Sequence, residues 1–234
     1  NGKSFLWTTE TDGWNHLYVI GLDGRKHLPV TPEAFDVIEL KSVDEKNGLV
    51  YFLASPSNAT QKYLYQKKLN GKGDLKRITP ADQSGTHDYA ISPGSMFARH
   101  SFSNTYTQPL SEFIRLPKHE AVNPSESISE KLKVPQAENV TDFFKITTED
   151  GVEMDGWMVK PIGFDESKKY PVVFFVYSEP AGQTVVDQYG ASLNYIYAGD
   201  MRKDDYIYIS LDNRGTPVPK GNDWRKSIYR KIGD

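Results

Sequence analysis

Tyr177 closes an apolar run, YPVVFFVY at residues 170–177, and a polar loop follows it. A phenol at the end of a strand can donate a hydrogen bond to charge that develops in a transition state. One such donor is worth about 3 kcal/mol. Many strands also end in a tyrosine that has no chemical role. The sequence therefore leaves two interpretations of Tyr177, a strand end or one wall of an active site.

A serine hydrolase built on an α/β sheet needs a serine on a G-x-S-x-G turn, followed by an acid and then a histidine. The imidazole accepts the serine proton, and the acid orients the imidazole. The sequence contains no G-x-S-x-G motif, and no histidine follows residue 140. A complete triad on the segment after residue 140 is therefore excluded. The five histidines are His16, His27, His87, His100 and His119.

Other reactive combinations are weaker. His87 lies beside Asp88, but adjacent residues on a strand point to opposite faces, so we expect a solvent-exposed histidine and no acid–base pair. GTPVPKG, at residues 215–221, lacks the spacing of a phosphate-binding loop. The chain has no cysteine, which excludes thiolate nucleophiles and zinc–thiolate sites. We predict neither a metal site nor a cofactor.

The bulk composition is that of an ordinary globular protein. The 234 residues carry a net charge of -3, and the pI is near 6.0. This charge favours neither a nucleic-acid partner nor an anionic membrane surface. No apolar run approaches the roughly 18 residues needed to span a bilayer.

The first half of the chain contains an internal repeat. LYVIGLDGRKHLPVTPE, at residues 17–33, returns as LYQKKLNGKGDLKRITPAD, at residues 64–82, and a fainter copy occupies residues 111–122. The Asp-Gly and Asn-Gly pairs within the first two copies predict hairpin turns. A period of about 40–50 residues is typical of four-stranded β-propeller blades. A closed propeller needs about four to eight blades, so we expect only part of one here.

The pattern changes after residue 118. Residues 123–135 predict a short helix that begins after Asn123 and ends before Pro135. Beyond residue 140, a hairpin with its turn at Asp150-Gly151 precedes two buried apolar strands, at residues 167–177 and 204–212. Residues 192–201 and 223–234 are predicted to be helical. Strands that alternate with helices indicate an α/β sheet.

Two segments then carry a resemblance to a known family. FDESKKYPVVFFVYSEPAGQTV, at residues 164–185, and YISLDNRGTPVPKGNDWRKSIYRKIGD, at residues 208–234, resemble the bacterial members of the dipeptidyl peptidase IV branch of the prolyl oligopeptidase superfamily. In that family a β-propeller caps an α/β-hydrolase domain. The resemblance implies a mixed fold, a partial β-propeller of about two and a half blades followed by the first part of an α/β-hydrolase domain. The expected boundaries are 1–118 for the blades, 119–140 for a linker with a short helix and 141–234 for the hydrolase part.

The resemblance also assigns roles to residues. Tyr177 matches the family's oxyanion-hole tyrosine, although Ser178-Glu179-Pro180 replaces the usual glycine-containing loop, and a carboxylate at Glu179 would oppose the developing charge unless it points away. Asp212, Arg214 and Gly215 match a structural loop, in which Arg214 pairs with a carboxylate and Gly215 supplies the turn. The nucleophile, acid and histidine are expected after Asp234, and the acidic pair that holds the substrate's amino terminus before Asn1.

The implied parent protein is an exported bacterial serine exopeptidase, periplasmic or on the cell surface. It releases N-terminal dipeptides, preferably after proline, by acyl-enzyme hydrolysis, and it acts on peptides with a free amino terminus. The resemblance also allows a homodimer. This chain alone is expected to be inactive. Two alternatives remain open, a non-catalytic interaction protein that keeps the same framework, and another member of the superfamily such as an acylaminoacyl peptidase or an oligopeptidase.

Overall fold

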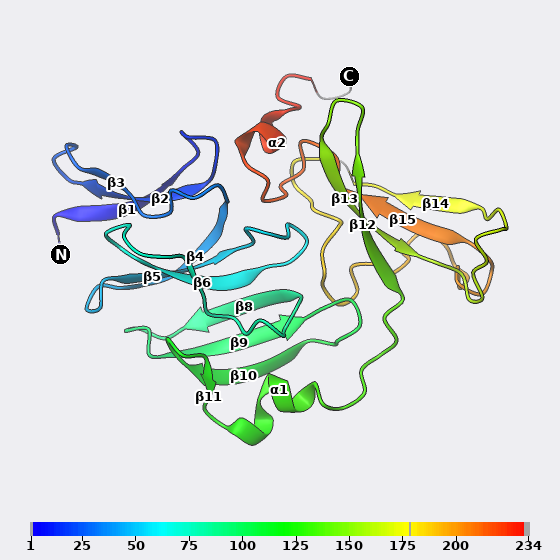
Figure 1. Cartoon of the computed structure of the whole chain (residues 1–234), viewed down its shortest axis with the longest axis horizontal. Coiled ribbons are helices and arrows are strands. Elements are labelled where there is room, and N and C mark those ends of the chain that lie inside the picture. The colour runs from blue at the N-terminus through cyan, green and yellow to red at the C-terminus, as the bar shows by residue number, and fades with distance from the viewer. Residues whose placement is uncertain (1, 178, 232–234) are drawn as a thin grey trace.

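In a computed structural model, the described residues, 2–177 and 179–231, form four β-sheets (Figure 1). Three of these sheets are antiparallel and follow one another along the chain, in the orders β1-β2-β3, β4-β5-β6-β7 and β8-β9-β10-β11. The strands are β1 (Ser4–Thr9), β2 (His16–Gly21), β3 (His27–Pro29), β4 (Val37–Asp44), β5 (Leu49–Ala54), β6 (Tyr63–Lys68), β7 (Lys76–Arg77), β8 (Thr86–Ile91), β9 (Phe97–Ser103), β10 (Leu110–Arg115) and β11 (Glu120–Ala121).

The internal repeat corresponds to equivalent positions in the first two sheets. The backbone N–H of Leu17 on β2 donates to the Thr31 hydroxyl at 3.0 Å, and that of Leu64 on β6 donates to the Thr79 hydroxyl at 2.8 Å. Gly71, in the second hairpin turn, has φ of +69° and could not carry a side chain, because a Cβ there would lie 2.3 Å from the Pro29 carbonyl oxygen. The repeated turn and threonine thus fix the same local structure twice.

The first three sheets pack against one another through strand β5. Its side chains alternate between two faces, as strand geometry requires. Val50 and Phe52 belong to the cluster shared with the first sheet, whereas Tyr51 and Leu53 belong to the cluster shared with the third. This explains why β5 is almost completely buried.

The fourth sheet lies on the other side of the molecule and has the order β12-β13-β15-β14 (Figure 1). The pairs β12–β13 and β13–β15 are antiparallel, but β14 and β15 run parallel. Trp157 is completely buried in its core together with Tyr208 and Val185. The elements are β12 (Thr141–Thr147), β13 (Glu153–Val159), β14 (Val172–Phe175), β15 (Ile207–Leu211) and the helix α2 (Asn222–Lys226).

Between the third and fourth sheets lie two short helical turns, η1 (Pro124–Glu126) and α1 (Ile128–Lys131). The single helix predicted for this segment is therefore wrong in its length. Asn123 makes no capping hydrogen bond through its side chain, whereas the Ser127 hydroxyl accepts from the backbone N–H of Glu130 at 3.2 Å. The side chain that caps α1 is Ser127, because the chain turns out of helical geometry there.

The helix predicted at residues 192–201 is also wrong. The Asn194 side chain accepts hydrogen bonds from the backbone N–H groups of Ile196 and Tyr197, both at 2.9 Å, and donates to the Tyr197 carbonyl. An asparagine side chain that binds its own neighbouring backbone competes with helix formation. The segment is therefore a series of turns, and strands dominate the described residues.

Two burial predictions also need correction. Residues 172–176 were expected to be covered on both faces, yet Val172, Phe174 and Val176 expose 45%, 56% and 54% of their surface, because β14 is an edge strand with one open face. His87 was expected to be exposed but is completely buried. His87 and Asp88 do point to opposite faces, but the inward-facing residue is the histidine.

Candidate functional site

Tyr177 and Asp212 lie at the same edge of the fourth sheet, because β14 and β15 are parallel and each residue follows the carboxyl end of its strand. In α/β sheets, ligands bind at this edge. Tyr177 is about half exposed, at 53%, so its phenol can be reached from outside. The carboxyl ends of β14 and β15, with the loops that follow them, are therefore the candidate site.

The loop after Tyr177 lies against the tyrosine ring. A Cβ added to Gly182 would be 2.5 Å from a ring carbon, so a glycine is needed for this close approach. Glu179 raises the pKa of the Tyr177 phenol, through a hydrogen bond and through its negative charge. The phenol therefore keeps its proton and remains a donor at neutral pH. The same carboxylate competes with a substrate oxygen for the hydrogen bond that the phenol donates.

Asp212 holds the loop in place. Its carboxylate is buried and accepts hydrogen bonds from the Thr184 backbone N–H at 2.9 Å, the Thr184 hydroxyl at 2.8 Å and the Val185 backbone N–H at 3.0 Å. Burial raises the pKa of Asp212, although these bonds favour its charged form. The Trp157 indole N–H donates to the Thr184 carbonyl at 3.0 Å from the other side. The loop beside Tyr177 is thus anchored from two strands.

Arg214 and Gly215 lie further from the tyrosine loop. The Arg214 guanidinium pairs with Asp150, in the turn between β12 and β13, at 2.5 Å, and both side chains are exposed. Gly215 has φ of +95°, and a Cβ there would lie 2.6 Å from Ile228, so its position requires a glycine. The structural role of this loop in the family and the oxyanion role of Tyr177 stay predictions.

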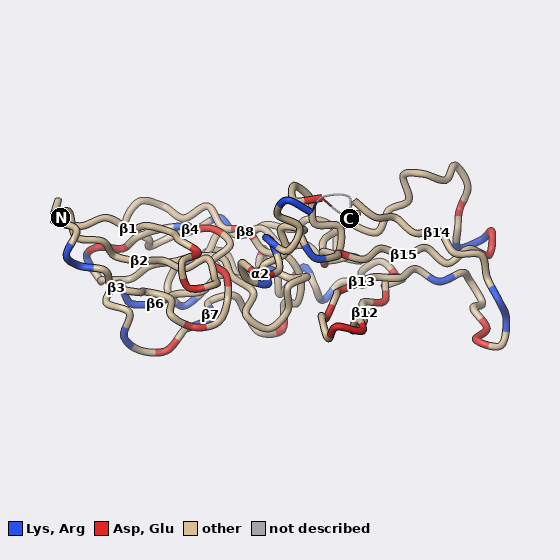
Figure 2. The backbone as a smooth tube through the Cα atoms, turned by 90° about the horizontal axis from the view of Figure 1, so that it is seen from above, with Lys and Arg blue, Asp and Glu red and all other residues tan. Residues whose placement is uncertain are grey.

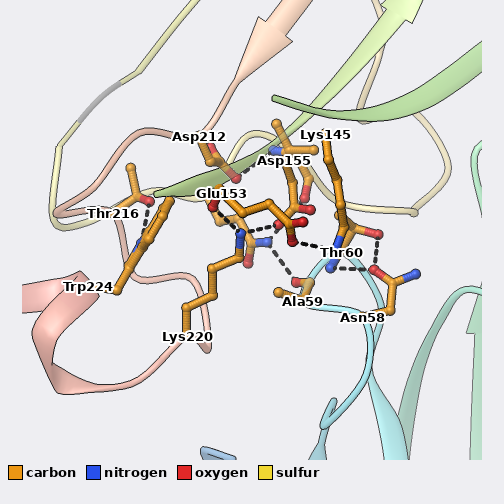
Figure 3. Close-up of polar contacts among 12 residues, drawn as sticks. Asn58, Ala59, Thr60, Lys145, Glu153, Asp155, Asp212, Thr216, Lys220 and Trp224 are labelled. Carbon is orange, nitrogen blue, oxygen red and sulfur yellow. Dashed lines mark hydrogen bonds and ion pairs between the residues drawn. The ribbon is translucent and has the colours of Figure 1, made fainter. Parts of the chain in front are cut away.

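A second polar group lies beside β13 (Figure 3). Lys220 pairs with Asp155 at 2.7 Å, donates to the Glu153 carbonyl at 2.9 Å and lies 4.6 Å from the centre of the Trp224 ring. Glu153 in turn pairs with Lys145 at 2.5 Å. Each charge here has an opposite partner, which indicates a structural group that fixes the segment before α2.

Ionic contacts join this segment to the first sheets. Asp36 is buried and pairs with Arg225 of α2 at 2.6 Å, while its two oxygens also accept from the backbone N–H groups of Asn15 and Gly221, both at 2.7 Å. Glu10 pairs with Arg225 at 2.6 Å as well. Sequence reasoning missed this network, because its members are separated by about 190–215 positions and no local pattern marks them.

Asp187 makes a second connection, from the loop after Tyr177 to the second and third sheets. It accepts from the Gln61 side chain at 2.7 Å and from the Thr105 backbone N–H at 3.1 Å. In the same loop, the Gln183 side chain donates to the Ala59 carbonyl at 3.0 Å. The tyrosine loop is therefore positioned by both halves of the molecule.

A pocket of about 320 Å³ lies between these contacts. Residues from three of the four sheets and from the last segment line it, and the lining is mixed polar and apolar. The lining residues include Asp36, Gln61, Gln183, Pro217 and Arg225. The sequence places no histidine in the segment that carries Tyr177, so a hydrogen-bond donor is present there without a general base of that type.

Residues 1–109 match the model of the dipeptidyl peptidase IV (DPP IV) N-terminal region. Over 98% of its length, the chain is 26% identical to a probable dipeptidyl peptidase 4 of Aspergillus flavus, of which it covers 30%. Over 91% of its length, it is 29% identical to a probable dipeptidyl-aminopeptidase B of Aspergillus terreus, of which it covers 23%.

The crystal structure of Porphyromonas gingivalis dipeptidyl peptidase 4 gives a TM-score of 0.80 at 27% identity and covers 98% of this chain, which corresponds to 32% of that protein. These similarities confirm the resemblance that the two motifs indicated. The antiparallel sheets match the N-terminal propeller region of that family. The chain spans about a third or less of the length of these relatives.

Proposed function

Because the chain is related to the dipeptidyl peptidases of the DPP IV type, we propose that it forms part of a serine exopeptidase that releases dipeptides from free amino termini, preferably after proline. The proposed parent protein supplies the serine, acid and histidine from residues outside this chain. Alone, the chain is inactive in this proposal, since it lacks a nucleophile–base pair after residue 140.

The observation that carries the proposal is the position of Tyr177. Its phenol lies at the carboxyl edge of a parallel strand pair, is half exposed and stays protonated, while Asp212 and Trp157 anchor the loop beside it. A donor held in this way stabilises negative charge on a substrate oxygen as that charge develops. In the proposed enzyme, Tyr177 donates to the oxyanion of the tetrahedral intermediate.

The exposed face of β14 supports the rest of the proposal. Val172, Phe174 and Val176 offer an apolar surface suited to the further helices of an α/β-hydrolase domain. Residues 141–234 are then the beginning of that domain. Among the described residues no helix could cross a membrane, and acidic and basic residues are interspersed along the backbone (Figure 2). We propose that the parent protein is exported and acts on peptides. A homodimer of that protein is compatible with this proposal.

The test is an assay of the full-length natural protein that contains this chain, with a Gly-Pro-chromophore substrate in free and amino-blocked forms. The proposal expects cleavage of the free form only. Replacing Tyr177 by Phe removes one hydroxyl and should lower kcat about 10²–10³-fold, with a small change in KM. The control is Tyr229→Phe, at a tyrosine that is 68% exposed and whose ring lies against the Arg230 guanidinium.

Other results of this assay would support one of the alternative functions or exclude the role of Tyr177. A full-length protein that cleaves neither form would indicate a non-catalytic interaction protein. Preferential cleavage of the blocked form would indicate an acylaminoacyl peptidase or an oligopeptidase. Unchanged kcat in the Tyr177→Phe variant would exclude the oxyanion role of Tyr177 and leave the family assignment untouched.

A further inference from the structure

The third sheet contains a row of histidines that the proposed peptidase chemistry does not use. His87 lies on β8, His100 on β9 and Glu112 on β10, and His119 follows in the turn between β10 and β11. His100 and Glu112 are directly opposite each other in the β9–β10 register. Cross-strand neighbours on one face lie close enough for their side chains to interact. The sheet therefore gathers residues from four separate places in the sequence.

Three of these side chains converge on one point. The ligand atoms of His100, Glu112 and His119 all lie within 4.8 Å of one another. The His100 ring is completely buried, and the Glu112 side chain exposes only 6% of its surface. The His100 and His119 rings approach edge to face, with centroids 4.8 Å apart. Two imidazoles and a carboxylate thus lie around one small, buried volume.

The hydrogen-bond chain fixes which nitrogen of His100 carries hydrogen. The Gln83 carbonyl can only accept, so the His87 Nε2 that lies 2.9 Å from it must donate. In a neutral ring, the His87 Nδ1 then accepts, and its partner at 2.8 Å, the His100 Nε2, donates. The remaining nitrogen of His100, Nδ1, therefore presents a lone pair.

That lone pair faces another acceptor. The His100 Nδ1 and the Glu112 Oε1 are 2.8 Å apart, and two acceptors at this distance need a positive species between or beside them. Either a proton or a metal cation can fill this position. A metal cation satisfies both acceptors with the imidazole neutral, which is the form of histidine that binds metals.

The surrounding contacts are those of an outer ligand shell. The second ring nitrogen of His100 is held by His87, and the second oxygen of Glu112 accepts from the Ile128 backbone N–H at 3.1 Å. Metal-binding histidines and carboxylates are commonly oriented by such hydrogen bonds. The Tyr89 hydroxyl lies 2.9 Å from the His119 Nε2. The ring of the same tyrosine stacks on the His100 ring. Both imidazole ligands thus have a partner that restricts their rotation.

His119 supplies an independent observation. Its backbone has φ of +58°, in the left-handed region that few residues other than glycine adopt. Strained residues of this kind cluster at functional sites. A strained backbone here directs the imidazole of His119 towards His100 and Glu112.

We propose that His100, Glu112 and His119 bind a divalent transition metal ion, Zn²⁺ by preference, within the third sheet. Imidazole suits zinc, whereas calcium and magnesium prefer sites made entirely of oxygen ligands. Two histidines and one glutamate with an open fourth position are a known zinc ligand set. No metal site was predicted from the sequence, in which the lack of cysteine excludes zinc–thiolate sites but not histidine and carboxylate ligands.

The test is a Zn²⁺ titration of the metal-free, full-length natural protein in competition with a chromogenic chelator. We expect one high-affinity equivalent, and a rise in Tm when zinc is added. His119→Asn keeps a residue that tolerates positive φ but removes the ligand. Its zinc affinity should fall by more than the roughly 10–100-fold that follows loss of an outer-shell partner.

The control is His27→Ala, which removes a histidine from β3, where it contacts the Gly24 carbonyl at 3.1 Å. This variant should bind zinc as the unaltered protein does. Equal affinity and equal Tm shift in the unaltered protein and in His119→Asn would overturn the proposal. A failure of the unaltered protein to compete with the chelator would also overturn it. Neither result depends on peptidase activity, so the proposal is tested separately from the proposed function.

Discussion

The first three sheets and the fourth sheet achieve burial in different ways. In the first three, each strand pairs with its neighbour in sequence, and β5 is covered by the sheets on both sides. In the fourth, the parallel pair β14 and β15 is separated by more than 30 residues of chain, and β14 keeps an exposed apolar face. A local hairpin needs only its own turn, whereas a parallel pair depends on segments that are distant in sequence.

The two regions also differ in how they are held together. Within the first three sheets, apolar contacts dominate the interfaces. Between these sheets and the last segment, the contacts are ionic and hydrogen-bonded, through Asp36, Arg225 and Asp187. Interfaces of the second kind break when a single partner is lost, because the other partner remains buried and unpaired. The comparison predicts that the two regions respond differently to single substitutions.

The largest effect is expected for Trp157→Ala in the core of the fourth sheet. Trp157 is completely buried and bonds to Thr184, so its removal should lower the free energy of unfolding by about 3–5 kcal/mol. Trp7→Ala on β1 is the control, since that side chain is 58% exposed. Urea denaturation, followed by fluorescence and by circular dichroism, measures both. Equal losses in the two variants would contradict the assigned core.

The next effect is expected at the contact between the regions. Asp36→Ala removes a buried carboxylate, leaves two backbone N–H groups without their partner and leaves Arg225 paired with Glu10 alone, which should cost about 3 kcal/mol. Asp150→Ala removes the exposed partner of Arg214 and should cost less than about 1 kcal/mol. If unfolding shows two transitions, Asp36→Ala should separate them further. A single unchanged transition would mean that this contact does not couple the regions.

The sequence predicted what depends on local patterns. The repeated turns and the hairpin at Asp150-Gly151 follow from side chains a few positions apart, and the structure has all of them. It failed where a side chain's surroundings come from elsewhere. Nothing in HDYAI indicates that His87 is buried by Gln83 and His100, and nothing in SLNYIYAGDM except Asn194 indicates its turns.

The candidate site divides in the same way. Tyr177 and Asp212 could be named as candidates because each follows a recognisable apolar strand within a segment that resembles the family. The contacts that position their loop, through Asp187, Gln61 and Thr105, join segments that are about 80–125 residues apart and have no sequence signal. A single sequence can thus indicate the residues of a site while leaving their support undetermined.

A smaller effect tests the repeat itself. Thr31→Val and Thr79→Val each remove the hydroxyl that accepts from a buried backbone N–H, of Leu17 or Leu64, and should each lower the free energy of unfolding by about 1–3 kcal/mol. Thr79 also bonds to the Tyr89 hydroxyl at 2.9 Å, so its loss should be the larger. Thermal denaturation of both variants measures the difference. A negligible effect in either would show that the repeated threonine has no structural role at that position.

The smallest effect concerns the pH dependence of the contact between β1 and α2. Burial raises the pKa of Glu10, but hydrogen bonds from Lys226 and Arg225 outweigh burial and hold it below its ordinary value of 4.5. A carboxyl whose pKa is lower in the folded state stabilises the protein above the unfolded-state value, and that stabilisation is lost as the pH falls through the folded-state value. The contribution should be less than about 1 kcal/mol, because Glu10 is partly exposed. Comparing Glu10→Gln with the unaltered protein should show a difference in unfolding free energy at pH 7 that shrinks below pH 4.5. A difference that is constant or grows on acidification would mean that Glu10 acts through packing rather than through its charge.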